Sequence, residues 1–183
     1  MVALAIAGGV LLTVALVSDG GARQKTAASS SPGDGAGLST AYRNAVVTIC
    51  TEDREAELEF KRGIDDVQTG ITSGDLSAVF SLPELMTATL VRERGLAGRL
   101  EALEGPAELE PVQLEAVATW RRKIAASEAV RARLNQAVVD SGGDALAFAP
   151  ALGQLSSAEE NRLEGQKDVL LRRLGGLRCE PSP

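Results

Sequence analysis

Two cysteines are the residues of this sequence whose type and number most directly imply a covalent bond. Cys50 and Cys179 are the only cysteines among the 183 residues. Two thiols in a chain that opens with an apolar segment fit a single disulfide in an oxidising compartment. Closing a loop of about 130 residues stabilises a fold by about 4–5 kcal/mol in the chain-entropy description. We therefore predict a Cys50–Cys179 disulfide, the alternative being two unpaired thiols, one in the core and one in a loose tail.

Carboxylates gather on the first predicted helix of the domain. Five acidic residues recur at or near helical spacing: Glu52, Asp53, Glu55, Glu57 and Glu59. Such a stripe could bind a cation or a basic partner, although a solvated face is its commoner form. We favour the solvated face, partly neutralised by Glu57–Lys61 and Glu59–Arg62 pairs. No calcium-binding loop pattern occurs, and we predict no metal ligand.

The sequence contains no histidine. Ser-His-Asp and Cys-His mechanisms are therefore excluded, as are bundle di-iron sites that use Glu-x-x-His. Aromatic residues make up only 3% of the chain, which argues against a sugar-hydrolysing site. No glycine pair has the context of a phosphate-binding loop. We predict no catalytic residue and no cofactor, and we do not expect an enzyme.

Charge also limits the partners. The net charge is -6, whereas a nucleic-acid partner needs a basic face, so we predict no nucleic-acid binding. The short basic run Arg121-Arg122-Lys123 could touch an acidic partner or a phosphate head group. On a long helix, such a run more often forms the solvent-exposed face, and we favour this interpretation here. Trp120 next to it is predicted to be a core or rim residue.

The first 39 residues are expected to target and tether the domain. Met1 to Val17 carries no charged side chain, which predicts a transmembrane anchor or signal over residues 1–19. We favour the anchor; cleavage near Gly20-Gly21-Ala22 is the alternative, giving a secreted protein. Arg23 and Lys25 oppose an external domain under the positive-inside rule, so we expect a basic leader upstream of this start. Residues 20–39, rich in Gly, Ser and Ala, read as a flexible linker.

Four segments of residues 40–180 have helical periodicity. The predicted helices cover Ser39 or Thr40 to about Ser73, Ser81 to Gly105, Pro111 to Asp140, and Ser156 or Ser157 to Gly175. Ser81 and Glu84 are expected to form a capping box. Leu76–Phe80 and Asp144–Leu155 are expected to be a short turn and a helical lid. Short connections favour an all-α, antiparallel up-down bundle of about four helices, which would bring Cys179 back to Cys50.

The Ile49-Cys50 context early in a long helix, the Leu- and Ala-rich body and the closing Leu177-Arg178-Cys179 resemble a broad set of actinobacterial membrane-anchored or secreted helical proteins of uncharacterised function. The resemblance covers residues 42–179 in layout. It implies an extracytoplasmic location and supplies no catalytic residue. We expect a non-enzymatic cell-envelope protein with a protein or envelope partner. The alternative is a small-ligand-binding or sensor domain with a pocket between helices, beneath the Asp144–Leu155 lid.

Overall fold

The computed structural model describes residues 40–153 and 158–179, all within the compact unit Gly35–Pro183. Its elements are α1 (Thr40–Thr72), the 3-10 helix η1 (Leu76–Ser81), α2 (Leu82–Glu101), α3 (Glu110–Ser141), α4 (Ala145–Leu152), α5 (Ala158–Gly175) and the 3-10 helix η2 (Gly176–Cys179). The described ranges contain helices and no strand, which confirms the all-α prediction. The predicted anchor, the linker and the Ser156 or Ser157 helix start lie outside these ranges.

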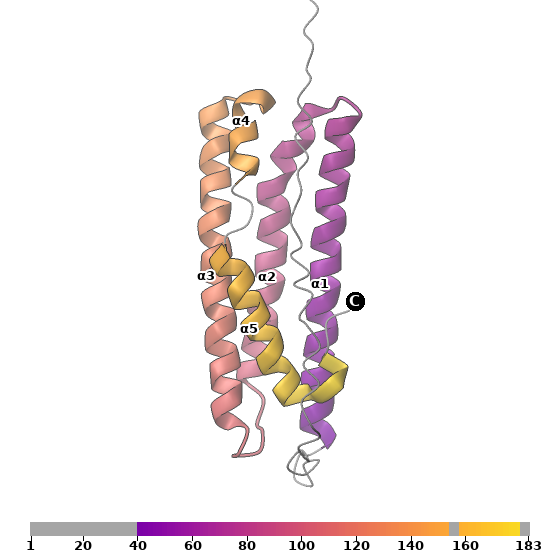
Figure 1. The fold of residues 1–183 in the computed structure, drawn as a ribbon, viewed down its shortest axis with the longest axis vertical. Helices are drawn as coiled ribbons and strands as arrows, with labels where there is room; N and C mark the ends of the chain where they lie inside the picture. The colour runs from indigo at the N-terminus through magenta and orange to yellow at the C-terminus, as the bar shows by residue number, and fades with distance from the viewer. Residues whose placement is uncertain (1–39, 154–157, 180–183) are drawn as a thin grey trace, which may run out of the picture. The chain divides into compact units, whose positions relative to one another are not determined.

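Three long helices run side by side, and a shorter helix crosses one face of them (Figure 1). The helices α1, α2 and α3 alternate in direction, with α2 between the other two. The fourth, α5, descends diagonally from α3 to the first turns of α1, while α4 packs beside the far end of α3. The described residues therefore form a single bundle, as predicted, but only three of its helices run its full length. On the remaining face, α5 covers one end of the bundle and α4 covers the other.

Local sequence signals account for the ends of these helices. Gly142 ends α3 with a φ of 57°, a left-handed conformation that glycine adopts readily. The Asp75 and Asp144 side chains accept hydrogen bonds from the backbone N–H groups of Ser77 and Leu146 (3.1 and 2.9 Å). The predicted Ser81 cap is wrong: Ser81 ends η1 with helical backbone angles, and its hydroxyl donates to the Ala78 carbonyl oxygen (2.8 Å).

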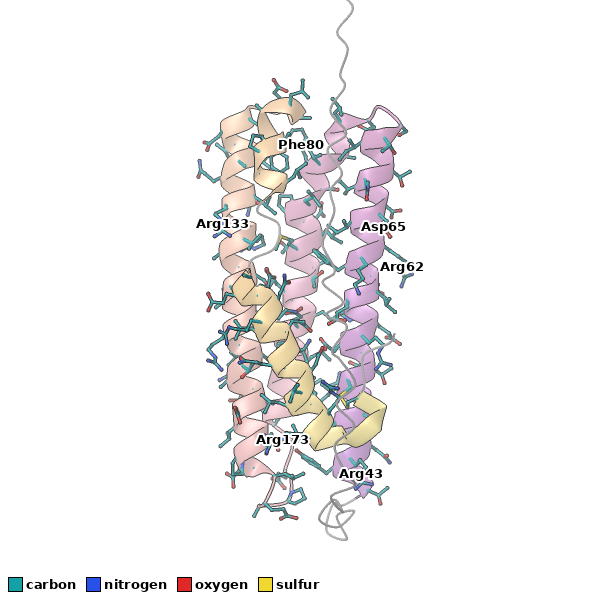
Figure 2. The ribbon with its side chains drawn as sticks, in the orientation of Figure 1. Arg43, Arg62, Asp65, Phe80, Arg133 and Arg173 are labelled. Atoms are coloured by element: carbon teal, nitrogen blue, oxygen red, sulfur yellow. A yellow bond between two sulfur atoms is a disulfide. The ribbon has the colours of Figure 1, made fainter. Side chains whose placement is uncertain are left out.

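The apolar core has two parts, one at each end of the bundle. Trp120 lies fully buried in the part near the disulfide, which also includes Val46, Leu100 and Leu174. In the other part, Phe148 from α4 is also fully buried. It packs against Phe80 with ring centroids 5.5 Å apart, and Figure 2 shows Phe80 beside α4.

As predicted, a disulfide joins the first helix of the domain, α1, to the last, η2. Cys50 and Cys179 are bonded and both are buried, which fixes η2 against α1. Leu114 of α3 is 58% exposed, because Gln113 and Val117 face the bundle instead. Among the described helices, none is long and apolar enough to cross a membrane.

Candidate functional site

A buried lysine lies at the centre of the domain's main polar cluster. Lys167 of α5 is completely buried, with its ammonium 5.0 Å from the centroid of the Trp120 ring. Its Nζ lies 2.6 Å from Asp53 Oδ2 of α1, contacts Glu164 on its own helix, and lies 3.6 Å from Glu57. The ammonium therefore couples α5 to α1 across the core.

A second lysine extends the same network to α2 and α3. Lys123 of α3 is buried, with its Nζ 2.5 Å from Glu93 of α2 and 2.6 Å from Glu164 of α5. Glu164 therefore binds both ammonium groups. With Asp168, which lies 3.8 Å from Lys167, seven residues form what we call the charge cluster. They are Asp53, Glu57, Glu93, Lys123, Glu164, Lys167 and Asp168.

The charge cluster holds five carboxyls against two ammonium groups, and this excess shapes the pKa values. Burial, followed by a hydrogen bond with Glu164, raises the pKa of Glu57 to about 8, so Glu57 holds a proton at neutral pH. Burial also raises the pKa of Asp168, to about 6, and that of Glu93. Burial acts the same way on Glu164, but the charges of Lys167 and Lys123 outweigh it and lower its pKa.

Both lysines stay protonated despite their burial. Burial alone would lower the pKa of Lys167, yet the carboxylates of Asp53 and Glu164 raise it well above the usual value. Burial and the charge of Lys167 also oppose protonation of Lys123, but Glu164 and Glu93 raise its pKa overall. The network is therefore an internal array of ion pairs bridging α1, α2, α3 and α5.

Three carboxyl groups of the charge cluster are close enough to suit a metal ion, since ligand atoms of Asp53, Glu57 and Glu164 lie within 4.8 Å of one another. The Lys167 ammonium accounts for this proximity, because it contacts all three carboxyl groups. A divalent cation among the same oxygens would meet the repulsion of that ammonium. Lys167 therefore fills the role that a metal would have here.

The structure corrects two sequence-based interpretations. The acidic residues of α1 were assigned to one solvated face, but Asp53 is buried and pairs with Lys167. Glu59 pairs with Arg92 of α2 (2.5 Å) rather than with Arg62. Lys123 was predicted to lie on the solvent-exposed face of α3 with Arg121 and Arg122. Only the two arginines are exposed, and Lys123 is buried.

Position within the apolar stripes is the signal that could have identified the buried charges. Lys167 lies four residues after Leu163 and three before Leu170, so it takes a core position of α5. Glu93 likewise lies three residues after Leu90 and three before Leu96. Charged residues at such positions face the core, and two of opposite sign on different helices can pair there.

On the outer surface, small residues line the exposed side of α2. These residues, which we call the α2 face, lie at three- and four-residue steps within a strip about 80° wide. They are Ala88, Val91, Gly95, Gly98 and Ala102, all exposed. Ion pairs border the strip on both sides: Arg92 and Arg99 reach α1, while Arg94 and Glu101 reach α3.

An open groove between α1 and α2 adjoins the start of the α2 face. We call it the head groove; its volume is about 420 Å³. Its lining includes Gly63, Asp66 and Val67 of α1, Ala78 of η1, and Glu84 and Leu85 of α2. Glu84 lies one helical turn before Ala88, so the groove leads onto the α2 face.

No match to this chain was found among protein-family models, curated proteins or solved structures.

Proposed function

We propose that this chain is a non-enzymatic cell-envelope protein whose helical domain binds a partner helix along the α2 face. In this proposal residues 1–19 anchor the chain in the membrane and residues 40–180 lie outside the cytoplasm. The buried Cys50–Cys179 disulfide supports an oxidising compartment. The layout resemblance to actinobacterial membrane-anchored or secreted proteins agrees with this location.

The observation that carries the proposal is the pair of exposed glycines on α2. A Cβ added to Gly95 or Gly98 would meet no heavy atom within 4 Å, and neither glycine has a left-handed backbone. A glycine inside a helix costs about 1 kcal/mol relative to alanine. Within the described residues no contact requires either glycine. Small residues do allow the backbone of a second helix to approach closely.

The rest of the α2 face suits such contact. Val91 is 61% exposed and supplies an apolar side chain within the strip. The flanking pairs Arg99–Glu52 and Arg121–Glu101 keep charged groups at the border, as in the polar rim of an interface. A partner helix could therefore desolvate an apolar strip without burying an unpaired charge.

The charge cluster supports a structural role in this proposal. Its ion pairs link α1, α2, α3 and α5, and the Lys167 side chain is closed off from solvent. Buried and paired ammonium and carboxylate groups hold the helices in one arrangement, which keeps the α2 face rigid for binding. The ligand-binding alternative fits less well, because Phe148 fills the space beneath α4 and the head groove is open rather than enclosing.

Site-specific photocrosslinking in cells tests the proposal. The full chain would carry a photoreactive residue at Val91, and Val139 of α3, which is 73% exposed, would serve as the reference position. We expect one discrete adduct from Val91 and none of that size from Val139. Adducts that are absent from Val91, or equal at both positions, would contradict binding at the α2 face.

A matched pair of variants separates the interface from the fold. Gly95→Leu with Gly98→Leu should abolish the Val91 adduct, because two branched side chains would hold the partner helix away. Gly165→Leu is the control: Gly165 is also exposed and open, but lies on α5. The control should keep the adduct.

A further inference from the structure

The head groove has an apolar floor between acidic rims. Val67, Ala78 and Leu85 supply apolar surface, and Asp66 and Glu84 lie on α1 and α2 at its two sides. Gly63 helps to shape the floor, because a Cβ there would come within 2.7 Å of the Leu85 methyl groups. Leu85 therefore packs against the bare backbone of α1.

The two rim carboxylates have no cationic partner among the described residues. Both Asp66 and Glu84 are exposed, and neither forms an ion pair with any residue that the structure describes. Arg62, four residues before Asp66, instead donates from Nε to the Leu58 carbonyl oxygen (3.2 Å). By contrast, the acidic residues along the middle of α1 are paired: Glu52, Glu55 and Glu59 all contact arginines of α2.

We infer that the head groove receives the basic end of the partner helix, with lysine or arginine side chains between Asp66 and Glu84. The inference rests on the proposed function and adds the partner's chemistry and direction. An apolar segment lies along the α2 face, and its cationic end reaches the groove. The aliphatic part of a lysine or arginine would cover Val67 and Leu85 while its charge meets the carboxylates.

The shape of the groove favours a peptide over a small molecule or an anionic membrane. It is open to solvent, and its lining residue Glu84 lies one helical turn before Ala88 of the α2 face, whereas small-molecule pockets enclose most of their ligand. Two unpaired carboxylates would repel anionic lipid head groups. The separation from Glu84 to Ala102 corresponds to about five turns of helix, so the partner segment should be of similar length.

Binding of two designed peptides to the full chain tests this inference. Both are fluorescent helices of about 18 alanine and leucine residues, a length set by the α2 face. One carries two lysines at one end and the other carries two glutamates there. Fluorescence anisotropy should show the lysine peptide binding about fivefold more tightly, as two exposed ion pairs allow, with the preference shrinking at high salt.

Two double charge reversals test whether the preference for the lysine peptide arises in the head groove. Asp66→Lys with Glu84→Lys should reverse the preference between the peptides. Glu108→Lys with Glu115→Lys makes the same change in net charge at exposed positions outside the groove and should leave the preference intact. Equal binding of both peptides, or an equal loss of preference in the control variant, would overturn the inference.

Two results distinguish this inference from the proposed function. A discrete Val91 adduct together with peptide binding that ignores charge would overturn the basic partner and leave the α2 face as an interface. Self-association of the full chain that Glu84→Lys abolishes would overturn it too, since the occupant would then be a second copy. Sedimentation velocity over a range of concentrations measures that association.

Discussion

Lys167 Nζ lies 2.6 Å from Asp53 Oδ2, and both residues are at least 95% buried. The pair joins α5 to α1 in the same region where the Cys50–Cys179 disulfide joins η2 to α1. One link is ionic and the other is covalent, and each holds the last helix against the first. Their relative contributions to stability can be measured separately.

Lys167→Met should destabilise the domain by about 3–5 kcal/mol. The substitution keeps an unbranched side chain of similar length but leaves Asp53 and Glu164 buried without their shared ammonium group. Urea unfolding monitored by the fluorescence of Trp120, the only tryptophan, measures the loss. Lys167→Met with Asp53→Asn should recover part of it, because one of the stranded charges is then removed.

Arg92→Met is the matched control for that prediction. Arg92 also bridges two helices through carboxylates, Glu55 and Glu59, but these side chains are exposed. Solvent screens such pairs, so the loss should stay below about 1 kcal/mol. Similar losses for Lys167→Met and Arg92→Met would show that burial gives the Lys167 pair no special importance.

Removing the disulfide by Cys50→Ser with Cys179→Ser should lower the free energy of unfolding by about 4–5 kcal/mol, because the two cysteines are 129 residues apart. The intact domain under a reducing agent should show the same loss. Limited proteolysis should then cut first near α5, since η2 is no longer fixed to α1. A reduced protein as stable as the oxidised one would mean that packing alone holds η2.

Stability should fall as the pH rises from about 4.5 towards 8. Glu57 has a pKa of about 8 when folded, against a usual value of 4.5. Between these values the folded chain keeps a proton that the unfolded chain releases, so raising the pH favours unfolding. Asp168, with its pKa raised to about 6, adds to the slope below pH 6. Glu164 acts oppositely, because its lowered pKa stabilises the folded state above about pH 4.5, and this contribution is lost as the pH falls.

Glu57→Gln tests the assignment of that slope. The amide can donate to Glu164 as the protonated carboxyl does, but it does not titrate. The Glu57 side chain is 36% exposed, so solvent reduces the effect and the fall removed should be roughly 1 kcal/mol. Free energies of unfolding at pH 5, 7 and 9 measure it. An unchanged slope in Glu57→Gln would assign the titration to other groups.

Helix positions in this fold follow directly from local sequence signals. Helical periodicity and the cysteine count predicted the main helices and the disulfide. Helical periodicity depends on residues only a few positions apart, and two cysteines allow a single disulfide pairing. The capping box at Ser81 failed because η1 runs without a break into α2, so the serine has no extended backbone from which to cap.

The charge cluster needed information that one helix does not contain. Lys123 follows Arg121 and Arg122, and on sequence alone the three form one basic run. Only the packing of α5 against α3 shows that Lys123 faces Glu164 while its neighbours face solvent. The α2 face was missed for a similar reason, because small residues carry little periodic signal and their exposure depends on where α1 and α3 pack.

Alanine at Gly95 and at Gly98 should each raise the free energy of unfolding by roughly 0.5–1 kcal/mol. The new methyl groups meet open space, so the gain in helix propensity has no steric cost. Gly175→Ala should do the opposite, because its Cβ would overlap Cys179 Sγ and approach Val46 to 3.1 Å. Thermal unfolding of the three variants measures both effects. If Gly95→Ala and Gly98→Ala destabilised the isolated domain, these glycines would serve the fold itself, and the case for a partner helix on the α2 face would lose its basis.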